Sequence, residues 1–214
     1  MPELDFAIDG VEVERFAVAP TLLFDLRISA PERAISNISL RCQVRIEPAR
    51  RGYEPGDHER LSELFGEKQR WGQSLQSFLW DHVNLSVPAF EGECTVKLPV
   101  TCNHDFNVAA TKYFHGLESG DAPLSFLFSG AVFFHDDDGR LQIDQVSWTK
   151  DAAFALPVAT WRALMARYYP DTTWLRVRND LFDRLYRYKR QNGFSDWDGT
   201  LDSLIPREVL EAAP

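Results

Sequence analysis

The stretch "ISNISLRCQVRIEP" at residues 35–48 indicates the fold class most clearly. Apolar residues recur at almost every second position, namely Ile35, Ile38, Leu40, Cys42, Val44 and Ile46. The residues between them are mainly polar or basic. This alternation is typical of a β-strand with one buried face and one solvent-facing face. The stretch therefore predicts a half-buried antiparallel strand that ends at Pro48.

Further strands are predicted on both sides of this stretch. "LDFAIDGVEVERF" (4–16) alternates around an expected turn at Asp9-Gly10, and "TLLFDLRIS" (21–29) follows it. Strand character returns at 74–90, 92–101, 125–134 and 141–148, where β-branched and aromatic residues are frequent. We therefore expect an antiparallel body of about seven to nine strands.

Helices are predicted chiefly in the last third of the chain. The apolar period changes at Pro157, and one helical face then follows, made by Val158, Trp161, Leu164, Met165 and Tyr168. A second face comprises Leu181, Phe182, Leu185 and Tyr188, with Gly193 as its cap. "WDGTLDSLI" (197–205) predicts a short third helix, and "HERLSELFGEK" (58–68) a short earlier one.

These patterns predict an α+β protein that is mainly β. The expected architecture is an antiparallel β-sandwich-like body with two or three C-terminal helices. We predict one domain over residues 1–214, with a β-rich body at 1–156 and a helical segment at 157–206. Residues 207–214 are expected to be a flexible tail.

Charge is distributed unevenly along the chain. The formal net charge of the 214 residues is −9, which argues against nucleic-acid binding because the phosphate backbone would be repelled. Residues 161–190, however, contain eight Lys or Arg and three Asp, a formal charge of +5. The predicted partner-binding candidates lie in this basic segment: Arg176, Arg178, Arg184, Arg187, Lys189 and Arg190. The alternative is that they pair with the acidic body or are solvated.

The cluster "HDDDG" at 135–139 is the densest group of potential metal ligands. Its adjacent Asp residues lack the alternating ligand spacing and the closing Glu of a calcium loop. Asp138-Gly139 is instead typical of a tight β-hairpin turn. We therefore predict that Asp136, Asp137 and Asp138 form a solvated hairpin tip.

A second group of potential ligands comprises Cys94, Cys102 and His104. Cys102 and His104 lie on the same side of an extended chain, and Cys94 could approach them from a neighbouring strand. Zinc usually takes three or four protein ligands, and no matching half-site accompanies these residues. They are candidates for a metal or redox site, with a structural role as the alternative.

The sequence contains no catalytic or cofactor-binding motif that we can identify. It has no HExxH, GxSxG, GxxxxGK[ST] or GxGxxG pattern. We therefore predict a protein that is not an enzyme and has no cofactor, although a dispersed hydrolase-like site is compatible with these absences. We predict a cytoplasmic protein without membrane insertion. The three cysteines lack the spacing of a disulfide framework, and we find neither a signal peptide nor an apolar stretch long enough to span a membrane. Self-association stays open.

Three blocks resemble a family known only by a domain-of-unknown-function label, found in actinobacteria and other soil bacteria. They are "LFGEKQRWGQSLQSFLW" (64–80), "VPAFEGECTVKLPVTCNHDFNVAATKYFHGLESGDAPLSFLFSG" (87–130) and "LPVATWRALMARYYP" (156–170). The resemblance covers nearly the whole chain. It implies a bacterial protein whose gene lies beside those of high-affinity nickel–iron hydrogenases, and it supplies no catalytic residues.

The leading functional prediction is a non-enzymatic accessory or binding protein for the assembly or maturation of a nickel–iron hydrogenase. Its expected partners are hydrogenase subunits or maturation factors. One alternative is a metal-handling or redox protein that uses Cys94, Cys102 and His104. Another is a chaperone-like protein that binds unfolded or immature chains, because a β body followed by helices is similar in architecture to a protein-export chaperone. Fold likeness alone does not transfer function.

Overall fold

The computed structural model describes residues 2–106 and 108–206, which divide into two compact units. The first unit, Met1–Trp174, is called the β-rich unit below, and the second, Leu175–Pro214, the C-terminal unit. The boundary follows α5 (Val158–Tyr168), which contacts β1, β7 and α4. This helix, predicted as part of the segment 157–206, therefore packs on the β-rich unit. The single-domain prediction stays a prediction, and the predicted tail 207–214 lies outside the described residues.

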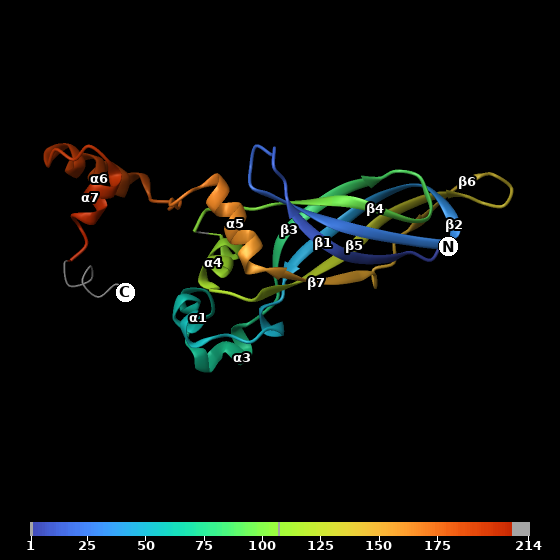
Figure 1. Ribbon diagram of the computed structural model, residues 1–214, viewed down its shortest axis with the longest axis horizontal. Coiled ribbons are helices and arrows are strands. Elements are labelled where there is room, and N and C mark those ends of the chain that lie inside the picture. The colour runs from blue at the N-terminus through green and yellow to red at the C-terminus, as the bar shows by residue number, and fades with distance from the viewer. Residues whose placement is uncertain (1, 107, 207–214) are drawn as a thin grey trace. The chain divides into compact units, whose positions relative to one another are not determined.

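The β-rich unit is built on a mainly antiparallel sheet, as predicted. Across the described residues the sheet has seven strands: β1 (Asp5–Val13), β2 (Thr21–Ile46), β3 (Phe78–Val87), β4 (Phe90–Thr101), β5 (Asp121–His135), β6 (Leu141–Gln145) and β7 (Asp151–Pro157). β2 is 26 residues long and is the common partner of β1, β3, β4 and β5. Figure 1 shows these strands side by side, with the β5–β6 hairpin at one end of the unit.

The two halves of β2 serve different neighbours. Residues 21–30 pair with β1 and β4, whereas residues 35–46 pair mainly with β3 and β5, apart from Ile35, which also pairs with Phe90 of β4. The registers shift between Ala30 and Ile35, where the strand changes neighbours. The apolar residues predicted along 35–46 are all buried. The sequence predicted two separate strands here. In the structure the two predicted strands are one. The chain stays extended through residues 31–34 and forms strand pairs again from Ile35 onward.

Aromatic side chains pack the two halves of the sheet together. Phe24 on the first half of β2 contacts Phe126 on β5 and Phe154 on β7, with ring centroids 5.1 and 5.7 Å apart. Phe6 on β1 stacks on Phe128 of β5 at 4.4 Å. Such contacts are those of packed sheet layers, which bury a shared apolar core.

Short helices cover one end of the sheet, as Figure 1 shows. They are α1 (Pro55–Arg60), α2 (Ser62–Phe65), α3 (Trp71–Ser74), α4 (Ala109–Gly116) and α5, with 3-10 turns at Pro48–Arg50 and Lys68–Arg70. Tyr113 and Phe114 of α4 are fully buried. Phe114 lies against Trp80 of β3 and Trp161 of α5, so α4 links the sheet to the outer helix.

A buried carboxylate connects the helices to the loop after α4. Asp57 is 1% exposed and accepts hydrogen bonds from the backbone N–H groups of Glu54 and Glu118. The guanidinium groups of Arg60 and Arg51 lie 3.4 and 3.7 Å from its oxygens. Because a buried charge is tolerated only with such partners, Asp57 is a structural tie.

Two predictions about the strands differ in outcome. The predicted turn at Asp9-Gly10 is wrong, because β1 runs through it with a bulge between Ile8 and Gly10. The side chain of Asp9 accepts a hydrogen bond from Arg27 on β2 at 2.7 Å, which holds the bulge against the neighbouring strand. The predicted β5–β6 hairpin is confirmed by antiparallel pairing from Ala131 to His135.

The C-terminal unit is helical over its described part, residues 175–206. It contains α6 (Asn179–Gln191) and α7 (Trp197–Asp202), both predicted from the sequence. Gly193, the predicted cap after α6, has a φ of 73°, the left-handed conformation that glycine adopts at little cost. No helix in the described ranges is long and apolar enough to cross a membrane.

Candidate functional site

The C-terminal unit carries a cluster of three aromatic rings, Phe182, Tyr186 and Trp197, called the aromatic triad below. The ring of Trp197 lies 5.4 Å from Phe182 and 6.4 Å from Tyr186, centroid to centroid. Phe182 and Tyr186 are four residues apart, so they share one face of α6. Their side chains nevertheless stay 44% and 47% exposed. The three rings therefore contact one another, but solvent still reaches much of the surface of Phe182 and Tyr186.

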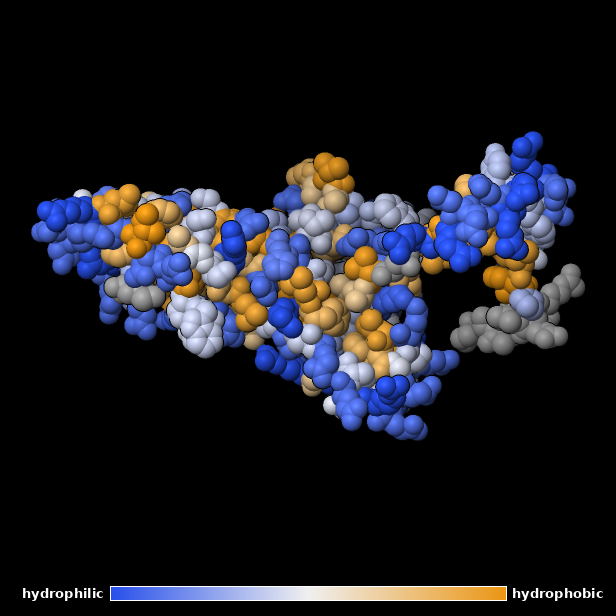
Figure 2. Space-filling view, turned by 180° about the vertical axis from the view of Figure 1, so that it is seen from behind, coloured by the Kyte–Doolittle hydropathy of each residue, from blue (hydrophilic) through white to orange (hydrophobic). Residues whose placement is uncertain are grey.

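Other apolar side chains of the C-terminal unit are exposed as well. They include Leu175, Val177, Leu201, Leu204 and Ile205. Among the described residues of α6, none is buried. Figure 2 shows this unit as mostly hydrophilic, with hydrophobic residues gathered along one side. Contiguous exposed apolar surface of this kind marks interaction sites in soluble proteins.

The start of α7 holds Trp197 in place. Asp196 caps the helix, because its carboxylate accepts hydrogen bonds from the Gly199 N–H and the Ser195 hydroxyl, both at 2.8 Å. These hydrogen bonds lower the pKa of Asp196 below its ordinary value. The buried Thr200 hydroxyl donates to the Asp196 carbonyl at 2.6 Å. A local hydrogen-bond network thus fixes the helix turn that presents the indole ring.

The six predicted partner-binding residues all belong to this unit. Arg176 and Arg178 precede α6, and Arg184, Arg187, Lys189 and Arg190 lie on it. All are exposed except Lys189, which is half-buried. Only Arg178 forms an ion pair within the described chain, with Asp180 at 3.2 Å. The alternative, that these residues pair with the acidic body, stays a prediction.

Contacts with neighbouring residues hold the Lys189 side chain in place. Its Nζ donates a hydrogen bond to the Phe194 carbonyl at 2.7 Å and lies 6.0 Å from the centroid of the Trp197 ring. The charges of Lys189 and Arg190 also lie in the last turn of α6, where they stabilise the negative end of the helix dipole. Arg187 and Arg190 line a shallow hollow of about 320 Å³ together with Gln191. Arg184, Arg187 and Arg190 are therefore the residues best placed to meet a partner.

Sequence reasoning missed part of this surface. The predicted face of α6 comprised Leu181, Phe182, Leu185 and Tyr188, and it omitted Tyr186. The four-residue spacing of Phe182 and Tyr186 was the available indication that the two rings share a face. Trp197 could not be placed beside them from sequence, because that contact depends on how α7 folds back on α6.

The candidate ligands Cys94, Cys102 and His104 do not form a cluster. Cys94 lies within β4 opposite Ile28, and Cys102 follows the end of the same strand, so the extended chain separates them by about 26 Å. His104 is buried, and its Nε2–H donates to the Thr172 carbonyl at 2.7 Å. No group of three or more His, Cys, Asp or Glu residues in the described ranges is arranged to hold a metal ion.

The thiols are free and are disfavoured as nucleophiles. Burial raises the pKa of Cys42 to about 12, and it also raises the pKa of Cys94 and Cys102 above the ordinary value. The thiolate is the reactive form of cysteine and the form that binds metals. These environments therefore favour a structural role for the three side chains.

The "HDDDG" cluster is a hairpin turn between β5 and β6, as predicted. The carboxylate of Asp136 accepts hydrogen bonds from the backbone N–H of Arg140 at 2.8 Å and of Asp138 at 3.1 Å. The Gln142 side chain donates a third at 2.7 Å. These donors lower the pKa of Asp136. Asp136 thus stabilises the turn.

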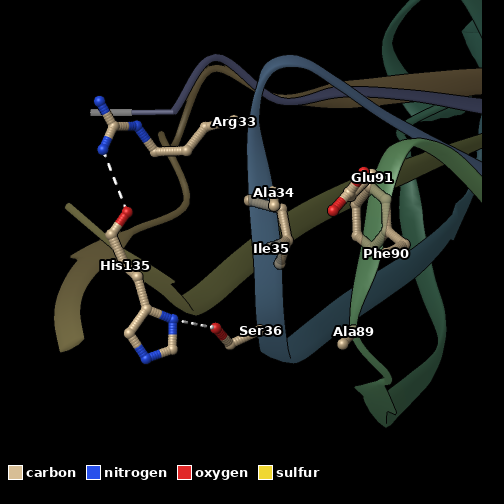
Figure 3. Close-up of a pocket in the computed structure, with 8 residues that line it drawn as sticks. All are labelled: Arg33, Ala34, Ile35, Ser36, Ala89, Phe90, Glu91 and His135. Carbon is tan, nitrogen blue, oxygen red and sulfur yellow. Dashed lines mark hydrogen bonds between the residues drawn. The ribbon is translucent and has the colours of Figure 1, made fainter. Parts of the chain in front are cut away.

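A hollow of about 450 Å³ lies where β2 changes neighbours, and Figure 3 shows its lining. The Ser36 hydroxyl lies 3.1 Å from Nδ1 of His135, whose carbonyl accepts a hydrogen bond from Arg33 at 3.1 Å. Glu91 comes from β4, away from His135 in this view. His135 is exposed, and within the described residues no carboxylate hydrogen-bonds its ring. The pair lacks the third group that orients a catalytic histidine.

Comparisons with known proteins give one family and little else. The model of DUF6084, a family of unknown function, matches residues 1–213. No curated protein matches the chain. A crystal structure of β-glucosidase from Kluyveromyces marxianus is 9% identical, with a TM-score of 0.27 over 73% of this chain. The match spans 15% of that protein's length, and it carries no argument about fold or function.

Proposed function

We propose that this chain, which belongs to the DUF6084 family of unknown function, is a non-enzymatic accessory protein whose C-terminal unit binds another protein. The observation that carries the proposal is the aromatic triad, in which Trp197 is half-buried while Phe182 and Tyr186 stay nearly half exposed. Tyr, Trp and Arg are the residues that most often dominate binding energy at protein interfaces. The triad and its neighbouring Arg residues supply all three kinds.

The charges exposed on α6 add to the chemistry expected of the partner. Arg184, Arg187 and Arg190 are exposed, and the one ion pair within the described part of the C-terminal unit, residues 175–206, is Arg178 with Asp180. The whole chain has a formal charge of −9, so an acidic partner would be repelled elsewhere and accepted here. The proposed partner is therefore a protein with an acidic surface beside an apolar groove.

The resemblance described for the sequence narrows the proposal further. We propose a nickel–iron hydrogenase subunit or maturation factor as the partner, in the cytoplasm of a bacterium. No geometry in residues 2–106 and 108–206 favours metal handling or chaperone activity over protein binding. Metal handling and chaperone activity stay predictions from the sequence.

A charge-reversal experiment tests this function. The double variant Arg184→Glu/Arg187→Glu removes the proposed charge complementarity. Because both side chains are exposed, we expect its free energy of unfolding to change by less than about 0.5 kcal/mol. The matched control is Lys68→Glu/Arg70→Glu in the β-rich unit, which changes the net charge equally at exposed positions.

The measurement is quantitative mass spectrometry of proteins captured from native cells by the tagged full-length chain. We expect hydrogenase subunits or maturation factors to be captured by the wild-type and control chains and lost with the double variant. Equal capture of those proteins by the double variant would remove the C-terminal unit from the proposal. Absence of hydrogenase proteins from every sample would remove the named partner.

A further inference from the structure

A pocket of about 460 Å³ lies within the β-rich unit and is lined by residues of that unit alone. Its lining includes Trp80, Asp81, Asn103, His104, Tyr169 and Trp174. The volume falls within the range of about 300–1,000 Å³ that is usual for small-molecule sites. Four of its twelve lining residues carry aromatic rings, and Asp81 supplies one carboxylate.

A β-bulge places two adjacent residues of β3 in the same wall. Val44 of β2 pairs with Asp81, whereas Arg45 pairs with Leu79, so Trp80 is an extra residue on β3. Neighbouring strand residues normally point to opposite faces, and a bulge changes this by re-aiming a side chain. Trp80 and Asp81 can therefore line one pocket.

Another part of the wall is the segment after α5, which several contacts hold in place. The imidazole of His104 stacks on Tyr169 with ring centroids 4.7 Å apart, while its Nε2–H donates to the Thr172 carbonyl. Tyr169 meets Trp174 edge-on at 5.0 Å. The backbone N–H of Phe106 donates to the Trp174 carbonyl at 3.2 Å. These contacts hold the rings in place before any ligand binds.

The electrostatic character of the pocket is negative. Asp81 accepts the backbone N–H groups of His82 and Thr101, and no Lys or Arg of the described chain lies within ion-pair distance of it. Its negative charge acts with burial to raise the pKa of Cys102, another lining residue. No Lys or Arg lies in the described lining.

Two further features of the wall concern its ligand: one is an exposed ring that suits a cation, and the other is an acceptor that suits a hydrogen-bond donor such as a hydroxyl group. Trp174 keeps 53% of its surface exposed, so part of its ring is available to a ligand, and the faces of aromatic rings attract cations. Nδ1 of His104 is buried without a hydrogen-bond partner among the described residues. With the proton on Nε2, this nitrogen presents a lone pair, and a buried acceptor without a donor is costly.

We propose that this pocket binds a small organic cation with an alkylammonium group, held by the Trp80 and Trp174 rings and the Asp81 carboxylate. Aromatic surfaces next to a carboxylate are the arrangement that recognises quaternary ammonium groups. The proposal does not depend on the proposed protein-binding function, because it uses residues of the β-rich unit alone.

Isothermal titration calorimetry of the full chain with choline and tetramethylammonium tests the proposal. The neutral isostere 3,3-dimethylbutan-1-ol has the shape of choline without its charge. We expect both cations to bind, and the isostere to bind at least about tenfold more weakly. Equal binding of the isostere, or no binding of either cation, would overturn the proposal.

Variants locate the binding to this pocket. Asp81→Asn keeps the side-chain shape and should weaken choline binding about tenfold, and Trp174→Ala should do the same. Trp148→Ala is the matched control, because Trp148 is 89% exposed and does not line the pocket. Unchanged binding in Asp81→Asn would place the cation elsewhere and overturn the assignment.

A trimethyllysine peptide is a second probe, because the same chemical group occurs on free molecules and on protein side chains. Choline binding at least as tight as peptide binding supports a free small molecule. Peptide binding without choline binding would assign the cation to a protein side chain and overturn the small-molecule form of the proposal.

Discussion

The aromatic clusters at the centre of the two units differ in burial, although the β-rich unit also has exposed aromatic residues such as Trp148. In the β-rich unit, Phe24, Tyr113 and Phe114 are fully buried. In the C-terminal unit, Phe182 and Tyr186 are nearly half exposed although they contact Trp197. The first set contributes to the stability of its own unit. The second set has apolar surface still available, and that difference points to binding in the C-terminal unit.

The comparison predicts unequal costs for the same substitution in the two units. Phe24→Ala should lower the free energy of unfolding by about 3–5 kcal/mol, because it leaves a cavity against Phe126 and Phe154. Phe182→Ala should cost less than about 1 kcal/mol, since much of its ring is already in water. Urea denaturation followed by circular dichroism measures both. Similar costs for the two variants would show that the triad is a structural core.

Glycine-to-alanine substitutions extend this comparison of the two units, and we expect them to change the free energy of unfolding by smaller amounts. At Gly130, φ is 142° and a Cβ atom would lie 2.0 Å from the Ser39 carbonyl oxygen of β2. Gly130→Ala should therefore destabilise the protein by roughly 3 kcal/mol, because a strand backbone must move. At Gly193, φ is 73° with open space around it, so Gly193→Ala should cost only about 1 kcal/mol. Thermal unfolding of both variants ranks them, and a reversed order would contradict the close packing of β5 on β2.

The sequence allowed the strands and helices to be predicted better than their contacts. The alternation at 35–46 marked every buried residue of that half of β2, and Asp138-Gly139 marked the hairpin. The joining of residues 21–29 and 35–46 into one strand was not predictable, because it depends on pairing with β4 and β5 on either side of the bend. The same holds for the pocket, whose Trp80, His104 and Trp174 meet only through tertiary folding. The basic residues of α6 were predicted, whereas the place of Trp197 was not.

The smallest predicted effect concerns a feature that the two units share. Asp136 in the β5–β6 turn and Asp196 at the start of α7 both have a lowered pKa, caused first by a backbone N–H donor. A carboxylate whose pKa is lower in the folded state stabilises it above the unfolded value of 3.8, and this contribution disappears as the pH falls through the folded value.

Both turns should therefore loosen in the same window below about pH 4. NMR pH titration of the Gly139 and Gly199 amides would follow each turn separately, with Asp196→Asn as the variant that retains a cap but no longer titrates. Loosening of Gly199 at the same pH in Asp196→Asn would show that another group controls α7. Equal behaviour of the two turns would mean that local capping is alike in both units, so that the contrast between them lies in the burial of their aromatic rings.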